Sequence, residues 1–249
     1  NCLEHPHRGL PSLAPRVKRQ AALSISSDPI PQHVDGFDKP AKSLRDLWPA
    51  GENEAQERLS RFADETIVDY EHLRDLPAKP GTSRLSAYLA AGVISPRQCL
   101  HGALASNHGE FDSGNPGVQT WINELIWREF YKHILTGYPQ VSRHRAFRSH
   151  TEALPWRNAP KELKAWKEGR TGFPIIDAAM RQLLETGWMH NRLRMVTAMF
   201  LSKTLLIAWP HGEPHFLRHP LDGHRAATNG GRPWVASSGP GPVPPLPVL

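Results

Sequence analysis

Hydrophobic residues recur at helical spacing along most of the chain. From Glu52 onward, Ala55, Leu59, Phe62 and Thr66 fall on one helical face, because about 3.6 residues make one turn. The same spacing predicts helices at about residues 117–136, 160–168, 174–186 and 188–208. No stretch alternates between apolar and polar residues as a half-buried strand does. The pattern therefore predicts an all-α fold.

Capping residues mark where some of these helices begin and end. Ser95 suits the N-cap position, Pro96 the first turn, and Gln98 completes a capping box. Pro174 opens the helix at 174–186, and Gly187 ends it, since glycine adopts the left-handed conformation of a helix C-terminus without strain.

The segment WINELIWREFY, residues 121–131, combines an apolar stripe with an unusual second face. Ile122, Ile126 and Phe130 form the stripe, four residues apart. The second face carries Trp121, Glu124, Trp127, Arg128 and Tyr131. Two interpretations remain open. Either a flat base stacks on the indoles while Glu124 accepts its hydrogen bonds, or Glu124 and Arg128 form an ion pair within an aromatic core.

The segment GTSRLS, residues 81–86, places three hydroxyls and a guanidinium at an expected helix start. These groups belong to Thr82, Ser83, Ser86 and Arg84. Together with backbone amides they suit a phosphate group, although a simple N-cap explains the same residues.

The segment GWMHNRLRM, residues 187–195, puts polar residues at the start of a strongly apolar helix. Asn191 and Arg194 share one face, with Arg192 beside them, and buried charges there require partners. Asp222, in the segment LDGHRAATNGGRPW, is the expected partner of Arg194. His190 by itself is interpreted as a core histidine rather than a catalytic group.

Charge and cysteine content narrow the class of protein. The 249 residues carry a net charge of +6 and a pI near 9.5, which suits a polyanionic partner. Cys2 and Cys99 form no disulfide framework, so we expect a reducing, cytoplasmic setting. No apolar run approaches the roughly 18 residues of a membrane span. Cys2, His5 and His7 lack a fourth ligand at a standard spacing, so no metal site is predicted.

The chain divides into three stretches of different composition. Residues 1–40 are rich in Pro, Ser and basic residues without periodicity and are interpreted as an interdomain connector. Residues 41–231 form the predicted helical domain, and residues 232–249 form a Pro-rich tail. Because the sequence begins with Asn1, we expect a fragment or a processed piece.

Taken in order, TSRLS, WINELIWREFY, GWMHNRLRM and LDG…NGG…W resemble the helical FAD-binding domain of the DNA photolyase and cryptochrome family. The resemblance covers about residues 45–231 and is greatest to bacterial class I cyclobutane pyrimidine dimer photolyases. It implies that the family's N-terminal α/β antenna domain and its last helices are missing. An antenna chromophore, of folate or deazaflavin type, is expected only if that domain exists.

The resemblance implies a light-driven repair enzyme, a deoxyribodipyrimidine photo-lyase. In this family, excited reduced FAD donates an electron to a pyrimidine dimer flipped out of DNA, the dimer splits, and the electron returns. The implied partner is DNA containing pyrimidine dimers, and the implied state is a monomer in the bacterial cytoplasm. The alternative is a cryptochrome-like blue-light photoreceptor, or an impaired fragment that only binds FAD or DNA.

The resemblance also assigns roles to residues. The implied catalytic residues are Glu124, which would hydrogen-bond the lesion base, and Trp127, which would pack against it. The implied cofactor-binding residues are Tyr70, Thr82, Ser83, Arg84, Leu85, Ser86, Trp121, Arg128, Arg194, Asp222 and His224. The implied DNA-binding residues are Arg74, Glu124, Trp127, Tyr131, Asn191, Arg192 and Trp234. Trp156 and Trp209 match two members of the electron-transfer tryptophan chain.

Three departures from the family pattern lie close together. His224 replaces an aspartate, Thr228 replaces the asparagine expected to face the flavin N5, and Arg232 replaces the tryptophan nearest the flavin. Arginine cannot be oxidised by excited flavin, so photoreduction is expected to fail or slow, while repair by chemically reduced flavin survives.

Overall fold

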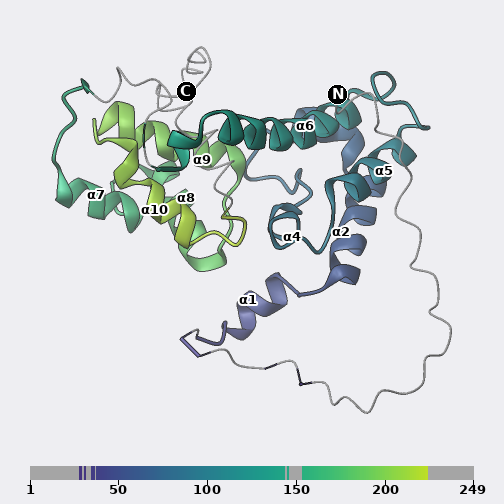
Figure 1. Cartoon of the computed structure of the whole chain (residues 1–249), viewed down its shortest axis with the longest axis horizontal. Helices are drawn as coiled ribbons and strands as arrows, with labels where there is room; N and C mark the ends of the chain where they lie inside the picture. Colours follow the sequence, from purple (N-terminus) through teal and green to yellow (C-terminus); the bar gives the residue numbers. More distant parts are fainter. Residues whose placement is uncertain are drawn as a thin grey trace. The chain divides into compact units, whose positions relative to one another are not determined.

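The computed structural model describes residues 28, 29, 31, 35, 36, 38–143, 145 and 153–223 (Figure 1). Within these residues every regular element is a helix and none is a strand, which confirms the predicted all-α fold. The helices are α1 (Lys42–Leu47), α2 (Glu52–Glu65), α3 (Tyr70–Leu73), α4 (Ser86–Ala91), α5 (Pro96–Ser106), α6 (Pro116–Gly137), α7 (Pro160–Lys167), α8 (Pro174–Thr186), α9 (Asn191–Met199) and α10 (Glu213–Arg218). Shorter turns are η1 (Ile67–Asp69), η2 (Pro139–Arg143), η4 (Phe200–Thr204) and η5 (Trp209–His211).

The chain separates into two compact units, Asn1–Ala50 and Gly51–Leu249. The first unit contains α1, which buries none of its residues. The second unit contains all the other helices and every described residue of the candidate site. The expected domain limits, 40/41 and 231/232, stay predictions. Across the part of the chain that the structure describes, no helix has the length and apolarity needed to cross a membrane.

The caps expected from the sequence are present. The Ser95 hydroxyl accepts a hydrogen bond from the Gln98 backbone amide at 3.1 Å, and the Gln98 side chain accepts one from the Ser95 amide at 2.8 Å. Pro174 is the first residue of α8, and Gly187 ends it with φ of 65°. The cap at the start of α6 was not foreseen: the Asn115 side chain accepts from the Gly117 and Val118 amides.

The expected helix at 188–208 is wrong at both ends. His190 is the N-cap of α9, because its side chain accepts the Arg192 backbone amide at 3.2 Å. The helix widens into the π-helical turn η4 and stops before Leu206, which has φ of 56°. Arg157 hydrogen-bonds the carbonyls of Leu205 and Leu206, at 3.1 and 2.8 Å, so this helix end is satisfied by another segment.

A first group of helices, α2, α3 and α5, packs with the turn η1 and the N-terminal half of α6. The Phe62 ring lies 5.8 Å from Tyr70 and 5.1 Å from Trp121, so these three rings join α2, α3 and α6. Gly117 allows the backbone of α6 to lie directly against η1, since a Cβ at this position would lie 2.3 Å from the Val68 carbonyl oxygen. This contact fixes α6 against η1.

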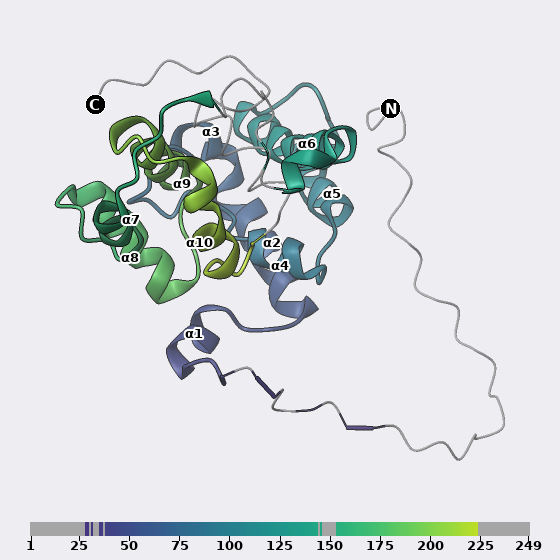
Figure 2. The ribbon, with the colours of Figure 1, turned by 60° about the vertical axis from the view of Figure 1, so that its left-hand side comes forward.

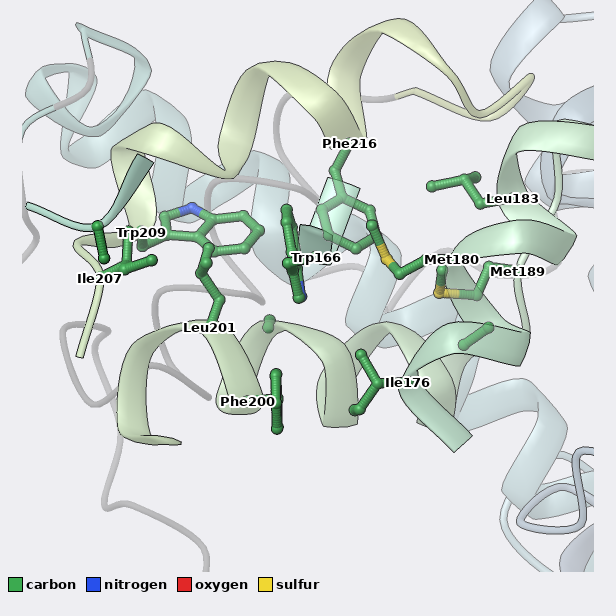
Figure 3. Packing of buried hydrophobic residues seen from close by; sticks show 13 residues of the cluster. Trp166, Ile176, Met180, Leu183, Met189, Phe200, Leu201, Ile207, Trp209 and Phe216 are labelled. Carbon is green, nitrogen blue, oxygen red and sulfur yellow. The ribbon is translucent and has the colours of Figure 1, made fainter. Parts of the chain in front are cut away.

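A second group contains α7, α8, α9 and α10 and has its own hydrophobic core (Figures 2 and 3). Trp166 lies fully buried at its centre, and its indole N–H donates to the Thr197 carbonyl at 3.0 Å. The Phe216 ring lies 5.7 Å from Trp166 and 5.8 Å from Trp209. Burial of Trp166 and Phe216 holds the start of α9 at a defined place, because α9 and α10 share this core.

Candidate functional site

The long helix α6 is buried only in its first half. Its buried residues are Gly117, Val118, Trp121 and Ile122. The expected apolar stripe is therefore wrong beyond Ile122, since Ile126 and Phe130 are 42% and 40% exposed, whereas Trp121 on the second face is 4% exposed. The reason is length: 22 residues extend about 33 Å, which exceeds the reach of the short elements packed against the helix.

Glu124 pairs with another helix rather than with its own. Its carboxylate lies 2.8 Å from the Arg74 Nη2 atom, just after α3. Arg128 instead donates to the Leu89 carbonyl at 3.2 Å, at the end of α4. The interpretation of an i, i+4 pair between Glu124 and Arg128 is thus wrong, and Glu124 lies half-buried at the junction of α3 and α6.

The Glu124 carboxylate acts electrostatically on two tyrosines, Tyr70 and Tyr131. Trp127 is exposed and stacks on Tyr131, with ring centroids 6.0 Å apart and an interplanar angle of 29°. Burial, together with the Glu124 charge, raises the pKa of Tyr131 to about 12. Burial also raises the pKa of Tyr70 well above its ordinary value, and Glu124 adds to that effect. Both phenols therefore stay protonated near neutral pH, and the Tyr70 ring additionally faces the Arg74 guanidinium at 5.7 Å.

Asp75 connects this region to the start of α9. Its Oδ1 atom lies 2.5 Å from the Arg192 Nε atom and 3.6 Å from the Arg74 Nε atom. Partial burial opposes ionisation of Asp75, but hydrogen bonding and charge from Arg192, together with the Arg74 charge, hold its pKa below the ordinary value. A continuous row of charged side chains therefore runs from Glu124 through Arg74 and Asp75 to Arg192.

None of the polar side chains in the segment at 81–86 caps a helix. The N-cap of α4 is Leu85, and no side chain caps that helix. The hydroxyls of Thr82, Ser83 and Ser86 have no hydrogen-bond partner among the described residues. Capping was the alternative explanation for this segment, and it does not hold.

Arg84 and Trp188 lie against each other across two segments far apart in the sequence. The Arg84 guanidinium lies 5.0 Å from the centroid of the Trp188 ring, and Arg84 has a positive φ of 52°. The Trp188 ring in turn meets His190 edge-on at 6.2 Å. The segment at 81–86 is thereby connected to the start of α9.

The expected pair between Arg194 and Asp222 is present. Two hydrogen bonds of 2.8 Å join the guanidinium to the two carboxylate oxygens, and the side chains are only 11% and 8% exposed. Arg194 also donates from Nε to the Met189 carbonyl at 2.7 Å. This bidentate pair fixes the last described residues against α9.

His190 contributes a buried donor. Its Nδ1 atom accepts the Arg192 amide, so the neutral ring carries its proton on Nε2. That Nε2 atom is buried and has no partner among the described residues. Burial holds the pKa of His190 below its ordinary value, so the ring stays neutral at neutral pH.

The remaining predicted residues lie at the edges of this arrangement or outside it. Asn191 is the exposed first residue of α9, and Leu85 is buried. Trp209 is buried in the second core, Trp156 is half-buried, and no ring contact within the described residues joins the two tryptophans. His224 and Trp234 lie outside the described residues, as do Thr228 and Arg232.

Sequence reasoning missed Asp75 and Trp188. Asp75 has no sequence signal beyond following Arg74, and its contact with Arg192 spans 117 positions. Trp188 lies inside GWMHNRLRM, so a search for aromatic residues in that motif would have found it. Within the described residues, no three His, Cys, Asp or Glu side chains are placed to hold a metal ion.

Comparisons with known proteins identify the family of this chain. The family profile described as the FAD binding domain of DNA photolyase matches residues 121–247. The deoxyribodipyrimidine photo-lyase of Escherichia coli (strain K12) is 47% identical over 238 residues, which is 95% of this chain and 49% of that protein.

Two solved structures are similar in fold. A bacterial class III photolyase from Agrobacterium tumefaciens matches with a TM-score of 0.74 and 41% identity, over 80% of this chain and 40% of the other. An archaeal photolyase from Sulfolobus tokodaii, solved with two FAD molecules, matches with a TM-score of 0.67 and 33% identity, over 82% and 42%. This chain thus spans about half the length of the curated relatives it matches. It belongs to the DNA photolyase family, to the part described as the FAD-binding domain.

Proposed function

We propose that the chain carries the FAD- and DNA-binding part of a deoxyribodipyrimidine photo-lyase, which repairs cyclobutane pyrimidine dimers in DNA by light-driven electron transfer. One observation carries the proposal. The Glu124 carboxylate acts electrostatically on Tyr131, which stacks on the exposed Trp127, and it pairs with Arg74 in the same row of charges as Arg192. A flipped-out base requires this combination, namely an acceptor for its polar edge, aromatic rings for its face and positive charge for its phosphates.

The described residues fit an FAD molecule. Three hydroxyls without partners among the described residues, together with the Arg84 guanidinium, supply donors for phosphate and ribityl oxygens. Under the proposal, the cofactor contacts come from Tyr70, Thr82, Ser83, Arg84, Leu85, Ser86, Trp121, Arg128, Arg194, Asp222 and His224. When bound, FAD supplies the excited electron that splits the dimer, and the protein contributes binding, orientation and exclusion of water.

Seven residues are proposed to meet DNA. They are Arg74, Glu124, Trp127, Tyr131, Asn191, Arg192 and Trp234. Arg74 holds the Glu124 carboxylate at 2.8 Å, so the side chain needs little reorganisation to accept a hydrogen bond. We further infer a monomer acting in the bacterial cytoplasm, where such a protein meets its DNA.

The photoreceptor alternative has no described residue in its favour. Its support came from the departures at His224, Thr228 and Arg232, which lie outside the described residues. Trp156 and Trp209 stay proposed electron carriers, and Arg232 stays the reason to expect poor photoreduction.

The test is repair of a dimer-containing oligonucleotide by the full chain. The chain is loaded with FAD, the FAD is reduced chemically, and repair is then measured under blue light. Glu124→Gln is expected to lower repair about tenfold or more, because a hydrogen bond to a charged group contributes about 1.5–3 kcal/mol. Glu129→Gln is the matched control, since Glu129 lies on the same helix but pairs with Lys132 at 3.1 Å. Flavin binding without repair by the unaltered chain would contradict the proposed function.

A further inference from the structure

We propose that Asp75 is a positioning residue, which holds the guanidiniums of Arg74 and Arg192 together so that both receive one phosphate of the DNA backbone. This inference rests on the proposed function only in taking DNA as the ligand. Asp75 is not among the residues expected to bind DNA or FAD, and as a carboxylate it repels phosphate. Its role is therefore indirect and acts through the two arginines.

The geometry brings the two arginines to a single oxygen atom. Oδ1 of Asp75 lies 2.5 Å from Nε of Arg192 and 3.6 Å from Nε of Arg74. The two Nε atoms can therefore be no more than about 6 Å apart, although the residues come from α9 and from the end of α3. Two guanidiniums at this separation can both reach the oxygens of one phosphate group.

Each guanidinium keeps a terminal nitrogen for an outside acceptor. Arg192 uses Nε for Asp75 and Nη1 for the Met195 sulfur at 3.5 Å, and its Nη2 meets no acceptor among the described residues. Arg74 uses Nη2 for Glu124, and its Nη1 is likewise without an acceptor in the described part of the chain. Protein groups thus occupy Nε and Nη1 of Arg192 and Nη2 of Arg74, while one terminal nitrogen of each side chain remains for a ligand.

A purely structural role does not explain the pair. The Asp75 side chain is 53% exposed, and ion pairs at such exposure contribute little to folding stability. Arginine side chains, in contrast, lose much rotamer freedom when they grip a phosphate, and prior fixation removes that cost. The low pKa of Asp75 keeps the carboxylate charged throughout the pH range of a DNA-binding assay.

The direction in which Asp75→Asn changes the affinity for DNA distinguishes a positioning role from a simple effect of charge. Asp75→Asn removes a negative charge next to the phosphate, so charge alone predicts tighter binding of DNA. Positioning predicts the opposite, a loss of about fivefold to tenfold, since the arginines must then be ordered upon binding. Glu71→Gln is the matched control: Glu71 lies on α3, four residues before Asp75, is exposed, and has no partner among the described residues.

The experiment measures binding of the FAD-loaded full chain to a dimer-containing duplex and to an undamaged duplex, by fluorescence anisotropy over a range of salt concentrations. For Asp75→Asn we expect weaker binding to both duplexes and a salt slope reduced by about 0.9 in magnitude, the value for one lost phosphate contact. Asp75→Glu retains the carboxylate and should bind within about twofold of the unaltered chain. The unfolding temperature should stay the same. If Asp75 only stabilised the fold, the substitution would lower it.

Binding by Asp75→Asn that is equal to or tighter than that of Glu71→Gln would overturn the inference. So would weaker binding that is accompanied by lower stability but an unchanged salt slope. Failure of the proposed function would give a different result from failure of this inference. The unaltered chain would bind the damaged and undamaged duplexes equally, while Asp75→Asn would still weaken binding to undamaged DNA.

Discussion

The bidentate pair between Arg194 and Asp222 allows a quantitative prediction about stability. Asp222→Asn keeps the size of the side chain but removes the charge that balances Arg194. Both side chains are nearly buried, and both hydrogen bonds measure 2.8 Å. A hydrogen bond to a charged group contributes about 1.5–3 kcal/mol. Asparagine keeps one acceptor, so we expect a loss of about 2–4 kcal/mol, a large part of the roughly 5–15 kcal/mol of a typical domain.

The assay is urea unfolding of the full chain, followed by circular dichroism, with the Glu162→Gln variant as control. Glu162 pairs with Arg157 at 3.0 Å, but both side chains are largely exposed. Removing this exposed charge should cost less than about 1 kcal/mol, because water screens the pair. If Asp222→Asn loses no more stability than Glu162→Gln, burial of the pair does not strengthen its contribution to folding, and the reasoning is refuted.

Two further predictions concern the cores. Burial lowers the pKa of His215 from 6.5 to about 4, so stability present above pH 6.5 is lost as the pH falls toward 4. We expect a loss of about 2 kcal/mol between pH 7 and 5, measured by urea unfolding, and a smaller one in His215→Gln. Gly117→Ala should cost about 1–3 kcal/mol, because the new Cβ meets the Val68 carbonyl. In thermal unfolding, Gly137→Ala on the same helix, with open space around it, should be neutral; equal losses would contradict the clash.

The sequence by itself determined the longer helices and several of their ends, but not the short helices α1, α3 and α10. The capping box at Ser95 and the left-handed Gly187 depend on residues within a few positions of one another, so local chemistry is sufficient to predict them. The pair between Arg194 and Asp222 was also foreseen, since a charge at the start of an apolar helix requires a partner and the resemblance supplied it. The end of α9 was not foreseen, because Arg157 satisfies it from a distant segment.

Only the tertiary structure decided which polar residues meet around Glu124. Helical spacing suggested a pair between Glu124 and Arg128, whereas the carboxylate pairs with Arg74 and Arg128 donates to the Leu89 carbonyl. The bridge from Asp75 to Arg192 has no counterpart in the sequence pattern. The physical reason is that periodicity determines which residues share a helical face, whereas the other packed helices determine which face is covered and which charges come within a few ångströms of each other.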